Sequence, residues 1–249
     1  MRLPRPSWGW ASLPALVLLW SLIATRFPSY ILPQPWEVAV EGWRWLGDGK
    51  LWPHLGTSLL EELGGFFAAI VAAVLLGVTA GISPAFRSFL TPLNSLFMAI
   101  PPIAWAPLTM IIFGLGYLSI VSVIFIAAVC PMTLAIQDGV QAIRGGEVRA
   151  ARILGANRMQ LLVHVYFPAS LPAFTTALRV GFSQAWRALV AAEMIGASQG
   201  IGWMVSTGGQ IGNASQVLLG IVLIGLIAWL AESLVFRRIE RHYQVWRSH

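Results

Sequence analysis

The sequence has few charged residues and an excess of apolar ones. Charged residues are 10% of its 249 residues, against about 25% in soluble domains, while hydrophobic residues reach 57% and the mean hydropathy is +0.73. A soluble fold needs a charged surface that this composition cannot supply, whereas lipid requires none. We therefore expect an integral membrane protein, and soluble enzyme classes are excluded.

Cysteine, lysine and histidine are also scarce, and each scarcity excludes a chemistry. The single cysteine, Cys130, lies in an apolar run, so an intrachain disulfide and a cysteine-based metal cluster are impossible. The only lysine, Lys50, precedes Leu51, so the chain lacks the Lys-Ser or Lys-Thr of an ATP phosphate loop. The histidines lie outside the apolar spans and in no ligand spacing: His54, His164, His242 and His249. We predict a non-catalytic chain that binds no metal or other cofactor itself.

Several apolar stretches are long enough, or nearly so, to cross a hydrocarbon layer of roughly 30 Å at 1.5 Å per residue. They are residues 12–25, 59–82, 90–115, 118–136, 172–195 and 217–236. The first resembles a signal peptide, but no Ala-x-Ala-like site precedes Arg26, so we expect an uncleaved helix. The sequence thus predicts an all-α membrane protein with six transmembrane helices. We divide it into an N-terminal helix with an interfacial segment (1–58), a membrane core (59–236) with a cytoplasmic loop (137–171), and a basic tail (237–249).

The positive charges gather on one side of this topology. Alternating the spans from a cytoplasmic N-terminus places most cationic residues inside: Arg2, Arg5, Arg87, Arg144, Arg149, Arg152, Arg158, Arg237, Arg238, Arg241 and Arg247. The positive-inside rule therefore predicts that both termini are cytoplasmic. Topology and anionic lipid, rather than nucleic acid, then explain the net charge of +6. The Trp-rich residues 27–58 suit the outer interface, with a short amphipathic helix over 35–46.

Prolines interrupt the third apolar stretch near its middle. Pro101, Pro102 and Pro107 remove backbone donors, and lipid penalises each orphaned group by several kcal/mol. The break must therefore face protein or a watery cavity. One interpretation is an ordinary kinked helix packed on its neighbours. The other is broken backbone lining a solute path, with Ile103 and Trp105 in its wall, although Trp105 also suits packing against lipid.

Charged residues interrupt the fifth stretch, at Arg179, Arg187 and Glu193. A charge at mid-membrane costs roughly 2.5–3.5 kcal/mol on insertion scales, so these side chains must face the bundle interior or a cavity. A structural interpretation gives each a counter-charge or carbonyl on another helix, and we favour it for Arg179 and Glu193. For Arg187 both interpretations are open: a structural role and a place on a solute path. Arg187 and Glu193 remain candidates for the path.

The longest cytoplasmic connection contains a predicted short helix over 147–154, because good helix formers precede Gly155. Its apolar residues fall near one face and its arginines beside that face. A helix lying on lipid headgroups would have this pattern, and so would a helix that docks on a partner. The candidate docking residues are Glu147, Arg149, Ala150, Ala151, Arg152, Leu154, Gly155 and Arg158.

This loop resembles the EAA loop of the permease subunits of type I ATP-binding-cassette importers, which reads Glu-Ala-Ala, three residues, Gly and a later Leu-Pro. The matching residues are Ala150, Ala151, Gly155, Leu171 and Pro172, while Arg149 stands where the family usually has Glu. Further stretches resemble the subfamily that imports taurine, aliphatic sulfonates, nitrate, bicarbonate and some thiamine precursors. They are residues 32–35, 51–59, 100–108, 113–116, 177–181, 189–194 and 200–202, with a departure at Glu61, where the subfamily has a basic residue.

The resemblance implies a permease that moves a small solute, a sulfonate or another oxyanion first, across the bacterial cytoplasmic membrane. It implies separate ATPase subunits that bind ATP and Mg and dock on the loop. It also implies an external solute-binding protein and a second permease chain, which we expect to be identical. A stand-alone secondary transporter or channel is the alternative; it would need inverted repeats and a buried ion site, and no repeat relates the two halves. A structural scaffold is disfavoured by the prolines at mid-depth.

Overall fold

The computed structural model describes residues 11–143, 145–236 and 238. Arg2, Arg5, Arg144 and the basic tail other than Arg238 lie outside the described residues. The first half of the chain forms α1 (Ser12–Ala24), α2 (Pro35–Gly47), α3 (Leu51–Ile82), α4 (Pro84–Ala99), the 3-10 turn η2 (Pro102–Trp105) and α5 (Ala106–Phe113). The second half forms α6 (Tyr117–Gln141), α7 (Gly145–Ile153), α8 (Arg158–Leu161), the π-helical turn η3 (Leu162–Tyr166), α9 (Phe167–Gly196), α10 (Ile201–Gln210), α11 (Ala214–Leu230) and the π-helical turn η4 (Ala231–Phe236).

The predicted membrane segments all fold as helix, and the all-α prediction is confirmed. Within the described residues, three helices are long and apolar enough to cross a membrane unaided, namely Leu51–Ile82, Tyr117–Gln141 and Ala214–Phe236. Two bent helix pairs are long and apolar enough only together, as a broken span or a re-entrant loop: Pro84–Ala99 with Pro102–Phe113, bent by 91°, and Ser170–Gly196 with Ile201–Gln210, bent by 46°. The short apolar helix Ser12–Ala24 accounts for the remaining predicted segment.

Helix α6 forms the centre of the bundle, packed between α3 and α9. The face of α3 toward α6 consists of small residues, so the two backbones approach closely. A Cβ added at Gly77 would lie 2.8 Å from Ile136 Cβ, closer than van der Waals contact allows. The opposite face of α3 carries large exposed side chains such as Leu60 and Leu75. Helix α3 is thus built to pack on protein along one side and on lipid along the other.

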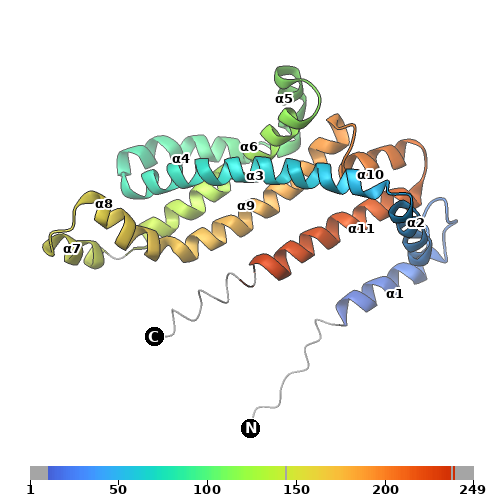
Figure 1. Ribbon diagram of the computed structural model, residues 1–249, viewed down its shortest axis with the longest axis horizontal. Coiled ribbons are helices and arrows are strands. Elements are labelled where there is room, and N and C mark those ends of the chain that lie inside the picture. Colours follow the sequence, from blue (N-terminus) through green and yellow to red (C-terminus); the bar gives the residue numbers. More distant parts are fainter. Residues whose placement is uncertain (1–10, 144, 237, 239–249) are drawn as a thin grey trace, which may run out of the picture.

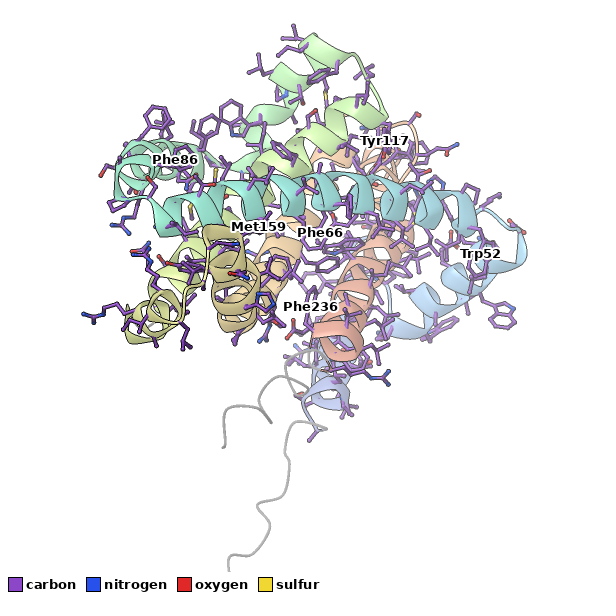
Figure 2. The ribbon with its side chains drawn as sticks, turned by 60° about the vertical axis from the view of Figure 1, so that its left-hand side comes forward. Trp52, Phe66, Phe86, Tyr117, Met159 and Phe236 are labelled. Atoms are coloured by element: carbon purple, nitrogen blue, oxygen red, sulfur yellow. The ribbon has the colours of Figure 1, made fainter. Side chains whose placement is uncertain are left out.

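The loop that contains α7 and α8 lies at the opposite end of the long axis from the Trp-rich segment with α2 and α10, as Figure 1 shows. Helix α2 begins with a capping box, in which Glu37 Oε2 accepts from the Gln34 backbone N–H at 2.8 Å. It carries the exposed Trp36 and Trp43, and Trp52 points away from the helices in Figure 2. The helix predicted over 35–46 is therefore confirmed.

Residues Ile201–Gln210, which lie between the fifth and sixth predicted membrane segments, form the further helix α10, which the sequence did not predict. Glycine disfavours helix by about 1 kcal/mol per residue, so local propensity gives no sign of α10. Its formation depends on contacts with α9, α11 and α3. Helix α3 also begins at Leu51, eight residues before the apolar run used to predict it.

Candidate functional site

The broken third span is the first feature of the candidate site. Helix α4 ends at Ala99, the backbone is extended at Ile100 and Pro101, and η2 starts a new direction at Pro102. Because Pro102 has no N–H, the Met98 carbonyl lacks its usual helical donor. The prolines therefore produce a sharp break with free backbone acceptors, rather than the gentle kink of a packed helix.

A partly open cavity of about 70 Å³ lies at this break. Its walls come from the end of α4, from η2, from α6 and from α9, and include Phe97, Met98, Pro102, Trp105, Cys130 and Gln184. The indole of Trp105 stacks on the Phe97 ring, with centroids 5.4 Å apart and planes inclined by 12°. Trp105 Nε1 is buried and has no hydrogen-bond acceptor among the described residues.

The predicted path residues are distributed around this cavity. Pro102 and Trp105 line it, whereas Pro101 and Ile103 are exposed beside it. Arg187 is exposed on α9, three residues beyond Gln184, and its Nη2 donates to Ser183 Oγ at 2.7 Å. No carboxylate of the described residues forms an ion pair with Arg187. The geometry thus places a guanidinium with no paired acid about one turn from a cavity wall.

Glu193 lies near the C-terminal end of α9 and is 1% exposed. Its carboxylate accepts from Ser58 Oγ at 2.5 Å and from the Gly202 N–H at 2.6 Å. Ser58 Oγ in turn accepts from the Ile201 N–H at 2.9 Å, and His54 Nδ1 accepts from the Gly200 N–H at 3.1 Å. The orphan N–H groups that begin α10 are thereby satisfied by side chains of α3 and α9. In this conformation Glu193 therefore holds α10 in place.

Two further carboxyl groups are buried next to Glu193. Glu61 is 3% exposed, and its Oε2 is buried without a partner in the described residues. Both oxygens of Glu62 are buried without a partner in the described part of the chain. That part contains no group of His, Cys, Asp or Glu side chains suited to a metal ion. Sequence reasoning noted Glu61 only as a departure from a pattern and missed His54 and Ser58, because their roles depend on a helix far along the chain.

Arg179 has the counter-charge predicted for it on another helical segment. Its Nε donates to Glu232 Oε2 at 3.1 Å, and a second nitrogen contacts the other oxygen of Glu232. This two-point contact joins α9 to η4, about two helical turns before Arg187 along α9. The structural interpretation of Arg179 is therefore confirmed.

The loop that contains α7 and α8 projects from the bundle and is largely exposed (Figure 1). Helix α7 covers the predicted helix, and Gly155 ends it with φ of +85°, a conformation that glycine adopts without steric cost. Asn157 and Gln160 then exchange side-chain and backbone hydrogen bonds that cap α8. Ile153 and Leu154 are 86% and 87% exposed at the tip. Arg149, Ala150 and Arg152 are also exposed, Ala151 is half-buried, and the side chains of Glu147 and Arg158 lie outside the described residues.

The helical bundle combines long apolar helices, a sharply bent apolar helix pair, a partly polar helix face and a loop that exposes Ile153 and Leu154, as expected of a membrane protein. The chain belongs to the family described as binding-protein-dependent transport system inner membrane component, whose pattern matches residues 65–244. The sequence-based assignment to the permeases of ABC importers is thereby confirmed.

Alignments with related permeases extend over nearly the whole chain. The taurine transport system permease protein TauC of Escherichia coli is 34% identical, with 98% of this chain and 94% of that protein aligned. The nitrate import permease protein NrtB of Leptolyngbya laminosa is 30% identical, and the alignment covers 88% of this chain and 81% of NrtB. The putative aliphatic sulfonates transport permease protein SsuC of Bacillus subtilis is 27% identical over 98% and 90%.

The solved structures support the fold. The MetNI methionine ABC transporter, in an inward-facing conformation, matches with a TM-score of 0.65 and 24% identity. The alignment covers 81% of this chain and 98% of the MetNI chain.

Proposed function

We propose that this chain is the permease of an ATP-driven importer for a small oxyanion such as a sulfonate, taurine or nitrate. The observation that carries the proposal is the exposed polar face of α9, on which Thr176, Arg187 and the neighbouring Gln184 share one side of an otherwise apolar bundle. Lipid does not accept an unpaired guanidinium at this depth, so this face must line water or another protein surface. The broken span and its cavity lie against the same helix.

The substrate class rests on the charge of this face and on the relatives. Arginine stays protonated at all accessible pH values, so Arg187 provides a permanent positive potential along the path. The related permeases are named for taurine, nitrate and aliphatic sulfonates, which all carry an anionic group. Pro101, Pro102, Ile103 and Trp105 form the wall of the path at the break. Glu193 contributes to the path by holding its outer end closed through α10.

Coupling to ATP hydrolysis takes place at the α7 loop. The residues that contact the ATPase are Glu147, Arg149, Ala150, Ala151, Arg152, Leu154, Gly155 and Arg158. Support comes from the exposure of Ile153 and Leu154, since two large apolar side chains at the tip of a loop are typical of a protein-binding surface. ATP and Mg bind to the separate ATPase subunits, and this chain is non-catalytic.

The complete importer contains two permease chains, which we infer to be identical, two ATPase subunits and an external solute-binding protein. The polar face of α9 is open in one chain, so a second copy is needed to enclose a path. The α7 loop and both termini are cytoplasmic, and the Trp-rich end with α2 and α10 faces outward in the bacterial inner membrane. Tryptophan at that end suits the outer headgroup layer.

The proposal is tested by purifying the tagged chain and reconstituting what accompanies it in liposomes. We expect an ATPase subunit to co-purify and uptake of a radiolabelled sulfonate to require ATP and the binding protein. Uptake by the permease alone, driven by an ion gradient without ATPase, would instead identify a secondary transporter.

A further inference from the structure

The cavity at the break has hydrogen-bond donors without acceptors. Trp105 Nε1 is buried and unpartnered, and a buried unsatisfied donor costs roughly 1–3 kcal/mol. Gln184 also lines the cavity, and its amide makes no hydrogen bond with the described residues. A donor left unpaired next to a cavity gains most from a ligand that brings its own acceptor.

The surroundings of these donors favour an anion. The residues that line the cavity include no acid, and the rest of the wall is apolar, as at Phe97, Met98 and Cys130. Apolar walls strengthen a hydrogen bond to a charged acceptor because they lower the local dielectric. Arg187, three residues beyond Gln184 on α9, adds a positive potential without closing the cavity. A cation would meet no carboxylate in this wall and would be repelled by the positive charge of Arg187.

The size of the cavity limits the ligand to a small group. A water molecule needs roughly 10–15 Å³ measured in this way. The volume of about 70 Å³ therefore has room for a head group of a few heavy atoms, such as a sulfonate, but not for a large solute. Because only two neutral donors reach the group, binding is weak enough to allow release, as a transport path requires.

We propose that this cavity is a transient subsite for the anionic head group of the solute, whose oxygens accept from Trp105 Nε1 and Gln184 Nε2. The inference rests on the proposed function and deepens it, because it assigns the residues that contact the solute at the break. Trp105 thereby acts as a hydrogen-bond donor to the solute, beyond forming the wall of the path.

Cys130 provides a direct probe, because it is the only cysteine of the chain and lines the cavity. Its thiolate attacks a methanethiosulfonate reagent, forms a mixed disulfide and releases methanesulfinate. We would compare the reagent that carries an ethylsulfonate with the one that carries an ethyltrimethylammonium group. The sample is the chain purified from its membrane with its accompanying subunits, and the peptide that contains Cys130 is followed by mass spectrometry.

The sulfonate reagent is expected to label Cys130 several-fold faster than the cationic one, and free ethanesulfonate is expected to slow labelling while tetramethylammonium does not. The Trp105→Phe and Gln184→Leu variants should raise the ethanesulfonate concentration needed for protection by roughly tenfold or more, the effect of losing a hydrogen bond to a charged group. Phenylalanine preserves the stacking on Phe97. Trp43→Phe, on the exposed face of α2, is the matched control and should change nothing.

Equal labelling by both reagents, no protection by ethanesulfonate, or no labelling of Cys130 by any reagent would overturn the subsite. These measurements are made on the unaltered chain, so they do not depend on the folding of a variant. ATP-dependent uptake is measured on the same preparation. Normal uptake without protection refutes the subsite alone, whereas protection without ATP-dependent uptake of any anion refutes the proposed import function and leaves the subsite standing.

Discussion

The hydrogen bonds of Glu193 can be used to test how the start of α10 is fixed to α3 and α9. In Glu193→Ala, Ser58 Oγ and the Gly202 N–H lose their acceptor in a buried position. Each unsatisfied donor costs roughly 1–3 kcal/mol, so the variant should lose about 2–6 kcal/mol of stability. For a chain of this size, 1 kcal/mol shifts the unfolding midpoint by roughly 2–4 °C, so a loss of about 2 kcal/mol already lowers it by roughly 4–8 °C.

The matched control is Glu61→Gln, on the helix that faces Glu193. Glu61 is buried, and its Oε2 has no partner in the described residues. An amide at position 61 keeps the size of the side chain and removes one of three crowded carboxyl groups. Glu61→Gln should therefore be neutral or stabilising.

Both variants are measured by thermal unfolding of the purified chain, with hydrogen exchange of α10 as a second readout. We expect faster exchange at the start of α10 in Glu193→Ala only. Equal midpoints for the two variants, or unchanged exchange in α10, would refute the argument that Glu193 caps this helix.

Other predictions concern coupling and the path. Gly155→Val forces a β-branched residue to φ of +85° and should abolish coupled uptake while the chain stays in the membrane. The control is Gly146→Val, in open space within α7. Normal uptake in Gly155→Val would contradict the docking assignment. Arg187→Gln should lose transport with normal assembly and basal ATPase activity; intact transport with a lower folded yield would make Arg187 structural. Cysteine at Ile103, in a Cys130→Ser background, should react with a water-soluble thiol reagent, and complete protection in every nucleotide state would place the break in a dry interior.

Composition and local pattern predicted the membrane segments, the helices now seen as α2 and α7, and the break at the prolines. These features depend on apolar length, on capping residues and on the missing N–H groups of proline, which are all local properties. The 91° bend at the break was not predictable, because a proline shows where a helix stops but not the direction that follows. Helix α10 was missed for a different reason. Its glycines disfavour helix, and its start is stabilised by His54 and Ser58, which lie more than 140 residues earlier in the chain.

Helix α9 connects the regions described above. It is a continuous helix of 30 residues, about 45 Å long at 1.5 Å per residue, and it begins next to the α7 loop. Along its length, Arg179 contacts η4, Gln184 lines the cavity and Glu193 holds the start of α10. A rigid helix moves as one body, so a displacement of the loop by a docked subunit shifts the cavity wall and the α10 cap together. Gly181 of α9 lies directly against Met132 of α6, where an added Cβ would overlap with the Met132 Sδ. A displacement of α9 would therefore have to be accommodated at its contacts with α6 as well as at the cavity wall and the α10 cap.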